Sequence, residues 1–91
     1  MELEGKTILV SGVGPGLGGA CAAAALRDGA NVIATARNLD RLQGAVTELD
    51  PDGERSLAMA ADIMDTDALG AAVAAGVERF GGLDGVVNVA A

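Results

Sequence analysis

The sequence predicts an α/β fold in which helices cover both faces of a parallel sheet, a doubly wound arrangement. Short continuous apolar runs alternate strictly with segments of helical periodicity along the chain. The runs lack polar residues at alternate positions, which is typical of strands buried on both faces of a parallel sheet. The chain has 91 residues, of which 51% are apolar and 21% charged, the balance of one small globular domain.

Four apolar runs are the expected strands. They comprise residues 7–10, 31–36, 56–60 and 83–88. Turn-forming residues separate them: Gly12 stops the first run, and Pro51-Asp-Gly53 precedes the third. Strands that alternate with helices pair in parallel through right-handed crossovers. This alternation predicts the element order β-α-β-α-β-α-β. For a doubly wound sheet of the Rossmann type we expect the strand order 3-2-1-4, with the sheet incomplete.

Three helices are expected between these strands. Residues 17–27 are rich in alanine, the strongest helix former, and Gly29 follows where a helix commonly ends. The other two helices show apolar stripes at helical spacing. The stripes consist of Leu39, Leu42, Val46 and Leu49 in the second helix, and of Leu69, Val73, Gly76 and Phe80 in the third. Asn38 is placed to cap the second helix, and either Asp65 or Thr66 to cap the third.

The incomplete sheet is expected to leave apolar surface exposed. The first two helices are placed on one face, and the third covers only part of the other face. We therefore expect Ile8–Val10, Val86 and Val87 to face water, although burying each such side chain would be worth about 1.5–3 kcal/mol. Gly70 and Gly76 lie inside the third helix and are each expected to cost about 1 kcal/mol relative to alanine.

The composition excludes several kinds of site. The sequence has no His, Tyr or Trp, which removes a histidine base, a Ser-His-Asp triad, a His-ligated zinc site and a tyrosine acid. The net charge of −7 offers no basic surface to nucleic acid. Cys21, the single cysteine, is interpreted as a packing thiol in a reducing, cytoplasmic setting. No apolar run reaches the length of a membrane span, and the acidic residues at 48–54 are interpreted as solvated surface rather than a metal site.

A glycine-rich loop joins the first strand to the first helix. It reads Ser11-Gly-Val-Gly-Pro-Gly-Leu-Gly18. A helix N-terminus presents unpaired N–H groups and the positive end of the helix dipole, which favour a pyrophosphate. Glycines permit the sharp turn and the close approach of the backbone to the phosphates. The strand before the loop, the helix after it and the βαβ spacing match a dinucleotide-binding loop of the Rossmann type. A tight turn without a ligand is the alternative.

Four segments, in order, resemble the short-chain dehydrogenase/reductase family. The first match is to its TGxxxG(I/L)G loop and consists of Ser11, Gly12, Gly16, Leu17 and Gly18, with serine keeping the hydroxyl of threonine. The later matches are Ala61-Asp62-Ile63, Phe80-Gly-Gly-Leu-Asp84 and Val87-Asn-Val-Ala-Ala91. They resemble the family's Asp-hydrophobic pair, its FGxLD motif and a degraded VNNAG. The resemblance covers the whole chain.

The resemblance implies a cofactor site at the carboxyl ends of the strands. The loop residues that would hold the pyrophosphate are Ser11, Gly12, Gly14, Gly16, Leu17 and Gly18. Asp62 and Ile63 would contact the adenine, and Asn88 and Ala90 would lie on the nicotinamide side. From the residues alone, two alternatives stay open: Asp62 as a cap of the following helix and Asn88 as a polar strand end.

The end of the second strand bears on the choice of nucleotide. An acidic residue there would bind the 2′-hydroxyl of an NAD ribose, but the sequence has Ala36 followed by Arg37. A guanidinium suits a 2′-phosphate, so we expect NADP in preference to NAD. Pro15 favours NAD instead, because many NADP-preferring relatives have a second basic residue at that loop position. Arg37 as a solvated helix residue paired with Asp40 is the alternative.

The resemblance also implies a reaction, hydride transfer between NADP(H) and an alcohol or carbonyl substrate in the intact parent protein. The family's relay of Ser, Tyr and Lys lies beyond the fourth strand, and this sequence has no Tyr and a single lysine, Lys6. Residues 1–91 are interpreted as the N-terminal half of a Rossmann NAD(P)-binding domain, with no second domain. A nucleotide-binding fragment without turnover is the alternative. For the intact parent we expect a homo-oligomer, with neither nucleic acid nor a membrane as partner.

Overall fold

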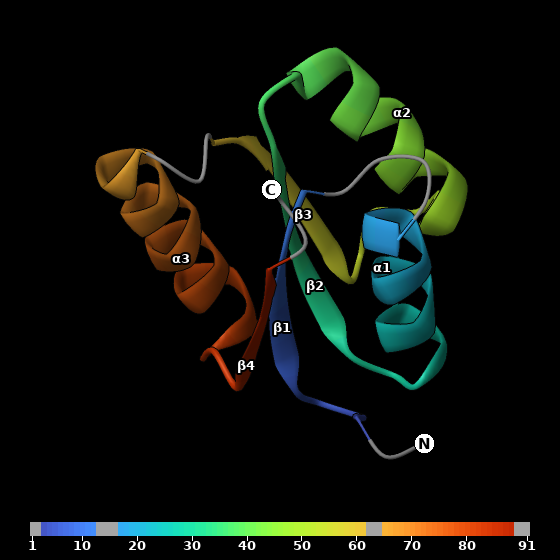
Figure 1. Ribbon diagram of the computed structural model, residues 1–91. Helices are drawn as coiled ribbons and strands as arrows, with labels where there is room; N and C mark the ends of the chain where they lie inside the picture. The colour runs from blue at the N-terminus through green and yellow to red at the C-terminus, as the bar shows by residue number, and fades with distance from the viewer. Residues whose placement is uncertain (1–2, 13–16, 62–64, 89–91) are drawn as a thin grey trace.

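Four parallel strands and three helices alternate along the chain, as predicted (Figure 1). The computed structural model describes residues 3–12, 17–61 and 65–88. In chain order the elements are β1 (Thr7–Ser11), α1 (Leu17–Arg27), β2 (Asn31–Ala36), α2 (Leu39–Leu49), β3 (Ser56–Ala60), α3 (Thr66–Phe80) and β4 (Gly85–Asn88). The sheet has the order β3-β2-β1-β4, and each neighbouring pair is parallel. Both the doubly wound class and the predicted strand order are confirmed.

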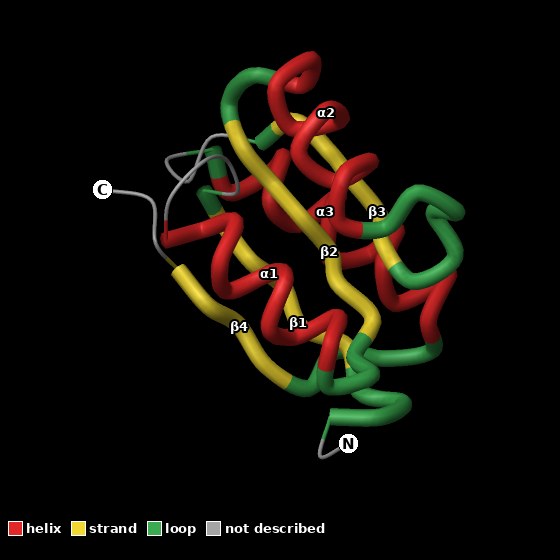
Figure 2. The backbone as a smooth tube through the Cα atoms, turned by 90° about the vertical axis from the view of Figure 1, so that its right-hand side faces the viewer, coloured by secondary structure: helices red, strands yellow, loops and turns green. Residues whose placement is uncertain are grey.

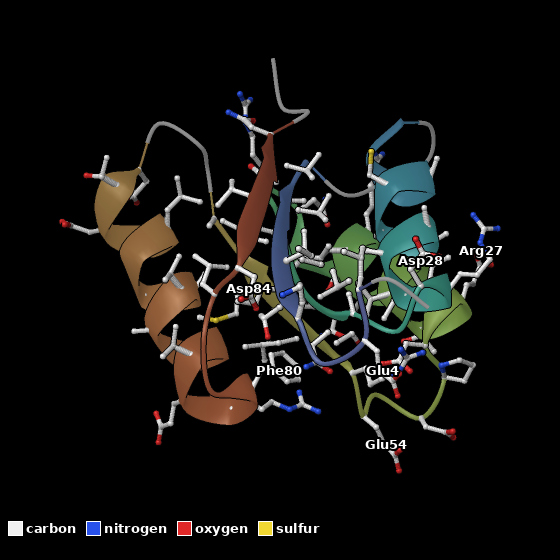
Figure 3. The ribbon with its side chains drawn as sticks, turned by 90° about the horizontal axis from the view of Figure 1, so that it is seen from below. Glu4, Arg27, Asp28, Glu54, Phe80 and Asp84 are labelled. Carbon is white, nitrogen blue, oxygen red and sulfur yellow. The ribbon has the colours of Figure 1, made fainter. Side chains whose placement is uncertain are left out.

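The molecule has three layers, with α1 and α2 on one face of the sheet and α3 on the other (Figure 2, Figure 3). One core lies beneath α1 and α2 and contains Val10, Val32 and Ala34 from the strands. Its buried helix residues are Ala22, Ala25, Leu26, Leu42 and Val46. The second core is smaller and joins Leu9, Ile33 and Ala72 beneath α3. The expected division of the helices between the faces is therefore confirmed.

The expected exposure of β1 is wrong. Leu9 is 5% exposed and Val10 is 0% exposed, because β1 lies between two strands and is covered by a helix on each face. Ile8 is half-buried against the first core. The expectation holds better for β4 at the edge of the sheet, where Val86 is 59% exposed and Val87 is half-buried.

The last strand begins two residues later than expected, at Gly85. Asp84 (labelled in Figure 3) precedes β4 and makes two hydrogen bonds with Thr7, the first residue of β1. The Asp84 N–H donates to the Thr7 carbonyl at 2.8 Å, and the Thr7 N–H donates to Asp84 Oδ2 at 2.8 Å. Leu83 packs against the second core. These contacts fix the approach of the chain to β4.

Helix ends follow the predicted signals. The Asn38 side chain accepts a hydrogen bond from the Arg41 N–H at 3.1 Å, and the Asp65 side chain accepts one from the Ala68 N–H at 3.0 Å. Asp65, not Thr66, is therefore the N-cap of α3. Gly81 ends α3 at a φ of 91°, a backbone conformation that glycine adopts without strain.

Two arginines anchor the amino edge of the sheet. Arg55 Nη1 donates to the carbonyl of Leu26, in the last turn of α1, at 3.0 Å. Arg79 Nη1 donates to the Ser56 carbonyl at 2.7 Å, and this bond links α3 to β3. Asp50 Oδ2 accepts from the Arg55 N–H at 3.1 Å and from Ser56 Oγ at 2.7 Å. Asp50, expected on a solvated surface, thus holds the turn that leads into β3.

Candidate functional site

The carboxyl ends of the strands meet at one edge of the sheet, where the sequence places most of its candidate residues (Figure 1). The strand order reverses direction between β1 and β4, because the chain leaves β1 toward β2 on one side and later returns to its other side. In open α/β sheets, ligands bind in the crevice outside the carboxyl ends at such a switch point. The residues that follow β1, β2 and β4 are therefore the candidates for ligand binding.

The glycine loop starts at this edge. Gly12 follows β1 with a φ of 88°, and its N–H donates to the Thr35 carbonyl of β2 at 2.8 Å. The chain then enters α1 at Leu17, so Leu17 and Gly18 form its first turn. The N–H groups of a first turn have no acceptor within their own helix. This arrangement, with the positive end of the helix dipole, has the donor chemistry that a pyrophosphate requires.

A row of polar residues crosses three strands beside this loop. Ser11 of β1 is aligned with Thr35 of β2 on one side and with Asn88 of β4 on the other. Leu9 and Ile33 belong to the core under α3, and strand side chains alternate between faces, so Ser11 and Thr35 also face α3. Asn88 lies on this face too, because its neighbour Val87 packs against the opposite core.

Burial differs along this polar row. Ser11 is 4% exposed and Thr35 is 0% exposed, whereas Asn88 at the edge strand is exposed. Among residues 3–12, 17–61 and 65–88, the buried Thr35 Oγ1 atom finds no hydrogen-bond partner. Sequence reasoning missed Thr35 and treated it as part of an apolar run. The available signal was a hydroxyl within that run, one residue before the strand ends.

Arg37 lies at the point where β2 leaves the sheet. Its side chain is exposed and precedes Asn38, the N-cap of α2. Ala36, the last residue of β2, is half-buried and brings no carboxylate to this position. The last position of β2 is therefore occupied by a small apolar side chain, and an arginine follows it directly.

Five of the predicted site residues lie outside the described ranges. These are Gly14, Gly16, Asp62, Ile63 and Ala90. The residue before Asp62 is described: Ala61 is 6% exposed, and its N–H donates to the Ala36 carbonyl at 2.9 Å. Since Asp65 caps α3, the alternative assignment of Asp62 as that cap is wrong.

The same ranges hold neither a candidate metal site nor a membrane-spanning helix. Within residues 3–12, 17–61 and 65–88, no group of three or more His, Cys, Asp or Glu residues is arranged to hold a metal ion. Among the helices that the structure describes, none combines the length and the apolar character needed to cross a bilayer. Cys21 is a half-buried free thiol packed against the first core.

The chain is similar in sequence to curated proteins. It is 34% identical over 94 residues to hydroxysteroid dehydrogenase-like protein 2 of Rattus norvegicus, covering 96% of this chain and 18% of that protein. It is 38% identical over 86 residues to the A-factor type gamma-butyrolactone 1′-reductase (1S-forming) of Streptomyces virginiae, covering 94% of this chain and 34% of the reductase. The chain therefore spans about a fifth to a third of the length of these relatives.

Solved structures show the same architecture. A short chain dehydrogenase from Mycobacterium smegmatis superposes with a TM-score of 0.87 at 36% identity, covering 97% of this chain and 38% of that one. A short-chain dehydrogenase/reductase from Brucella melitensis superposes with a TM-score of 0.88 at 31% identity, covering 94% of this chain and 36% of that one. Residues 6–91 match the family described as short chain dehydrogenase. The chain belongs to the short-chain dehydrogenase family.

Proposed function

We propose that this chain is the dinucleotide-binding part of a short-chain oxidoreductase and that its cofactor is NADP(H). The observation that carries the proposal is the position of the glycine loop. The loop leaves β1 at the carboxyl edge, next to the switch point between β1 and β4, and leads into the N-terminus of α1. Loops in this position bind the pyrophosphate of dinucleotides through backbone N–H groups.

The proposed binding residues divide into three groups along the edge. The pyrophosphate group comprises Ser11, Gly12, Gly14, Gly16, Leu17 and Gly18. Asp62 and Ile63, which directly follow the segment bonded to Ala36, serve the adenine. Asn88 and Ala90 serve the nicotinamide side, because β4 lies across β1 from β2. When bound, the nicotinamide supplies a hydride donor or acceptor.

The preference for NADP over NAD rests on the end of β2. An NAD ribose is commonly bound through its 2′-hydroxyl by an acidic residue at this strand end, but Ala36 has no such group. The exposed guanidinium of Arg37 is suited to the 2′-phosphate, which it can bind through two parallel hydrogen bonds. NAD is the alternative cofactor that the binding test includes.

For the intact protein we propose hydride transfer between the nicotinamide and an alcohol or carbonyl group. Two relatives support this class by name, one as a dehydrogenase-like protein and one as a reductase. The 91 residues contain no Tyr, the group that would exchange the proton in the family's relay, so we assign the proton transfer that accompanies the hydride to other parts of that protein. This composition also favours a second candidate function, nucleotide binding without turnover.

The compartment and the assembly are also part of the proposal. The free thiol of Cys21 supports a reducing, cytoplasmic compartment. We propose that the intact protein is a homo-oligomer.

Calorimetric titration of the chain with NADPH, NADH and ATP tests the proposal. We expect saturable binding of NADPH, weaker binding of NADH and weaker binding still of ATP, which lacks the nicotinamide half. Equal affinity for NADPH and NADH would contradict the NADP assignment alone. Failure of both dinucleotides to bind would contradict the dinucleotide site. Oxidation of NADPH by a carbonyl compound in the presence of these 91 residues alone would contradict the assignment of proton transfer to other parts of the protein.

A further inference from the structure

Thr35 combines complete burial with an unsatisfied hydroxyl. Its side chain is 0% exposed, and Oγ1 has no hydrogen-bond partner within the part of the chain that the structure describes. Most buried polar groups in native proteins are hydrogen-bonded, so an unpaired one requires an explanation. Valine has nearly the same shape without the hydroxyl and would fill this position in the strand at no such cost.

The location of Thr35 suggests where its partner comes from. Thr35 is the last residue but one of β2, between Ser11 of β1 and Met59 of β3. Its carbonyl accepts the N–H of Gly12, the first glycine of the loop. The next two residues are Ala36 and Arg37, the proposed neighbours of the adenosine ribose. The unsatisfied hydroxyl is thus attached to the strand that carries the adenosine end of the proposed cofactor site.

We infer that Thr35 is a positioning residue of the nucleotide site, whose hydroxyl gains a hydrogen-bond partner when the adenosine half of the nucleotide binds. This inference rests on the proposed function. Thr35 has no exposed surface in the nucleotide-free structure, so a partner reaches Oγ1 only when the residues beside it shift as the nucleotide binds. The polar atom that reaches Oγ1 comes either from the nucleotide itself or from a water that the nucleotide traps at the carboxyl edge.

The Thr35 hydroxyl has opposite effects in the free and in the nucleotide-bound protein. Without nucleotide, the unpaired hydroxyl destabilises the fold, because it has lost its hydrogen bonds to water and gained none in return. With nucleotide bound, the new hydrogen bond holds the end of β2 in place together with Gly12, which is bonded to the Thr35 carbonyl at 2.8 Å. A residue that served only packing would not show this reversal.

The test is Thr35→Val, measured by thermal unfolding without nucleotide and by calorimetric titration with NADPH. We expect the melting temperature to rise by about 4–8 °C, the shift of about 1 kcal/mol in a domain of this size. We expect the dissociation constant for NADPH to rise about fivefold, the equivalent of one lost hydrogen bond. Thr35→Ser keeps the hydroxyl and should retain the affinity. Thr7→Val, at the opposite end of β1 and also buried, is the matched control and should leave the affinity unchanged.

Ligand fragments locate the effect. The loss of affinity in Thr35→Val should appear in full with 2′,5′-ADP, which carries the adenosine half, and be absent with reduced nicotinamide mononucleotide. A crystal structure with 2′,5′-ADP then distinguishes the two sources of the partner, since Oγ1 contacts either a ligand atom or an ordered water present only with the ligand.

Three outcomes would overturn the inference. Unchanged affinity for NADPH in Thr35→Val would show that the hydroxyl has no part in binding. A lower melting temperature of Thr35→Val without nucleotide would show that the hydroxyl already has a partner, such as a permanent internal water. An affinity loss that Thr35→Ser shares in full would assign the effect to packing. If the unsubstituted chain binds no dinucleotide, the proposed function itself fails. In the three outcomes above the unsubstituted chain binds NADPH, so failure of the inference and failure of the proposed function can be told apart.

Discussion

Gly76 of α3 lies against Ile33 of β2 with no space for a methyl group between them. A Cβ atom built on Gly76 would stand 2.5 Å from Ile33 Cγ1 and closer still to its Cδ1. Ile33 is 0% exposed, so its side chain has to shift within the core to admit the methyl group. Gly76 is therefore the point at which α3 approaches the sheet, and the expectation that alanine would be better there is wrong.

Substitution of the two glycines inside α3 should give opposite results. Gly76→Ala should lower the free energy of unfolding by about 1–3 kcal/mol, because the added methyl overpacks the contact with Ile33. Gly70→Ala should raise it by about 1 kcal/mol, because alanine is the better helix former and, apart from the adjacent backbone of α3, no described atom lies within 4 Å of a Cβ placed there. Urea unfolding followed by circular dichroism measures both. Destabilisation of similar size in both variants would contradict the contact.

Loss of the Asp84 side chain should destabilise the pairing of β1 with β4. Asp84→Ala leaves the N–H of Thr7, a residue 1% exposed, without its acceptor, and we expect a loss of about 1–3 kcal/mol in the free energy of unfolding. Asp84→Asn keeps an acceptor oxygen and should lose less. Hydrogen exchange of the Thr7 amide gives a local readout, expected to accelerate in Asp84→Ala. An unchanged exchange rate would show that water replaces the carboxylate without cost.

Reversal of charge after β2 should change the nucleotide preference. Arg37→Asp removes the proposed partner of the 2′-phosphate and introduces an acidic group suited to a ribose 2′-hydroxyl. We expect affinity for NADPH to fall about ten- to a hundredfold, and affinity for NADH to be retained or improved. Parallel titrations with both nucleotides measure the change. Equal losses for the two would show that Arg37 does not discriminate between them.

A side chain in the glycine loop should block the pyrophosphate. Gly16→Val adds a branched side chain where the backbone is proposed to approach the phosphates, so we expect NADPH binding to be abolished and the melting temperature largely kept. Gly44→Val is the matched control, since the Gly44 position in α2 is open and distant from the loop in sequence. NADPH affinity retained in Gly16→Val would require the loop assignment to be withdrawn.

The arrangement of elements could be predicted because local signals agree along the chain. Asn38 and the apolar stripe that follows it indicate a helix whether or not the rest of the fold is known, and the structure places α2 over the predicted residues. The alternation of strands and helices then favours parallel pairing. Each helix forms the crossover that returns the chain to the start of the next strand, which therefore runs in the same direction. The position of the glycine loop after β1 could also be predicted, because it depends only on the neighbouring strand and helix.

Contacts between distant segments could not be predicted in this way. The burial of Val10 depends on β4, which joins β1 from the far end of the chain, and the need for glycine at position 76 depends on Ile33. The unpaired hydroxyl of Thr35 could not be predicted from the sequence either. A threonine in a strand is ordinary as sequence, and its missing partner is visible only when all of its neighbours are in place.

The contact between Thr7 and Asp84 has a consequence for folding kinetics. The two residues are 77 positions apart, so one edge of β1 stays unpaired while the intervening elements are synthesised. Contacts of such long range slow folding, because loop-closure entropy is lost before the contact forms. During translation, β1 therefore presents an open edge until β4 leaves the ribosome, and the nascent chain is most exposed to mispairing and chaperone capture in that interval.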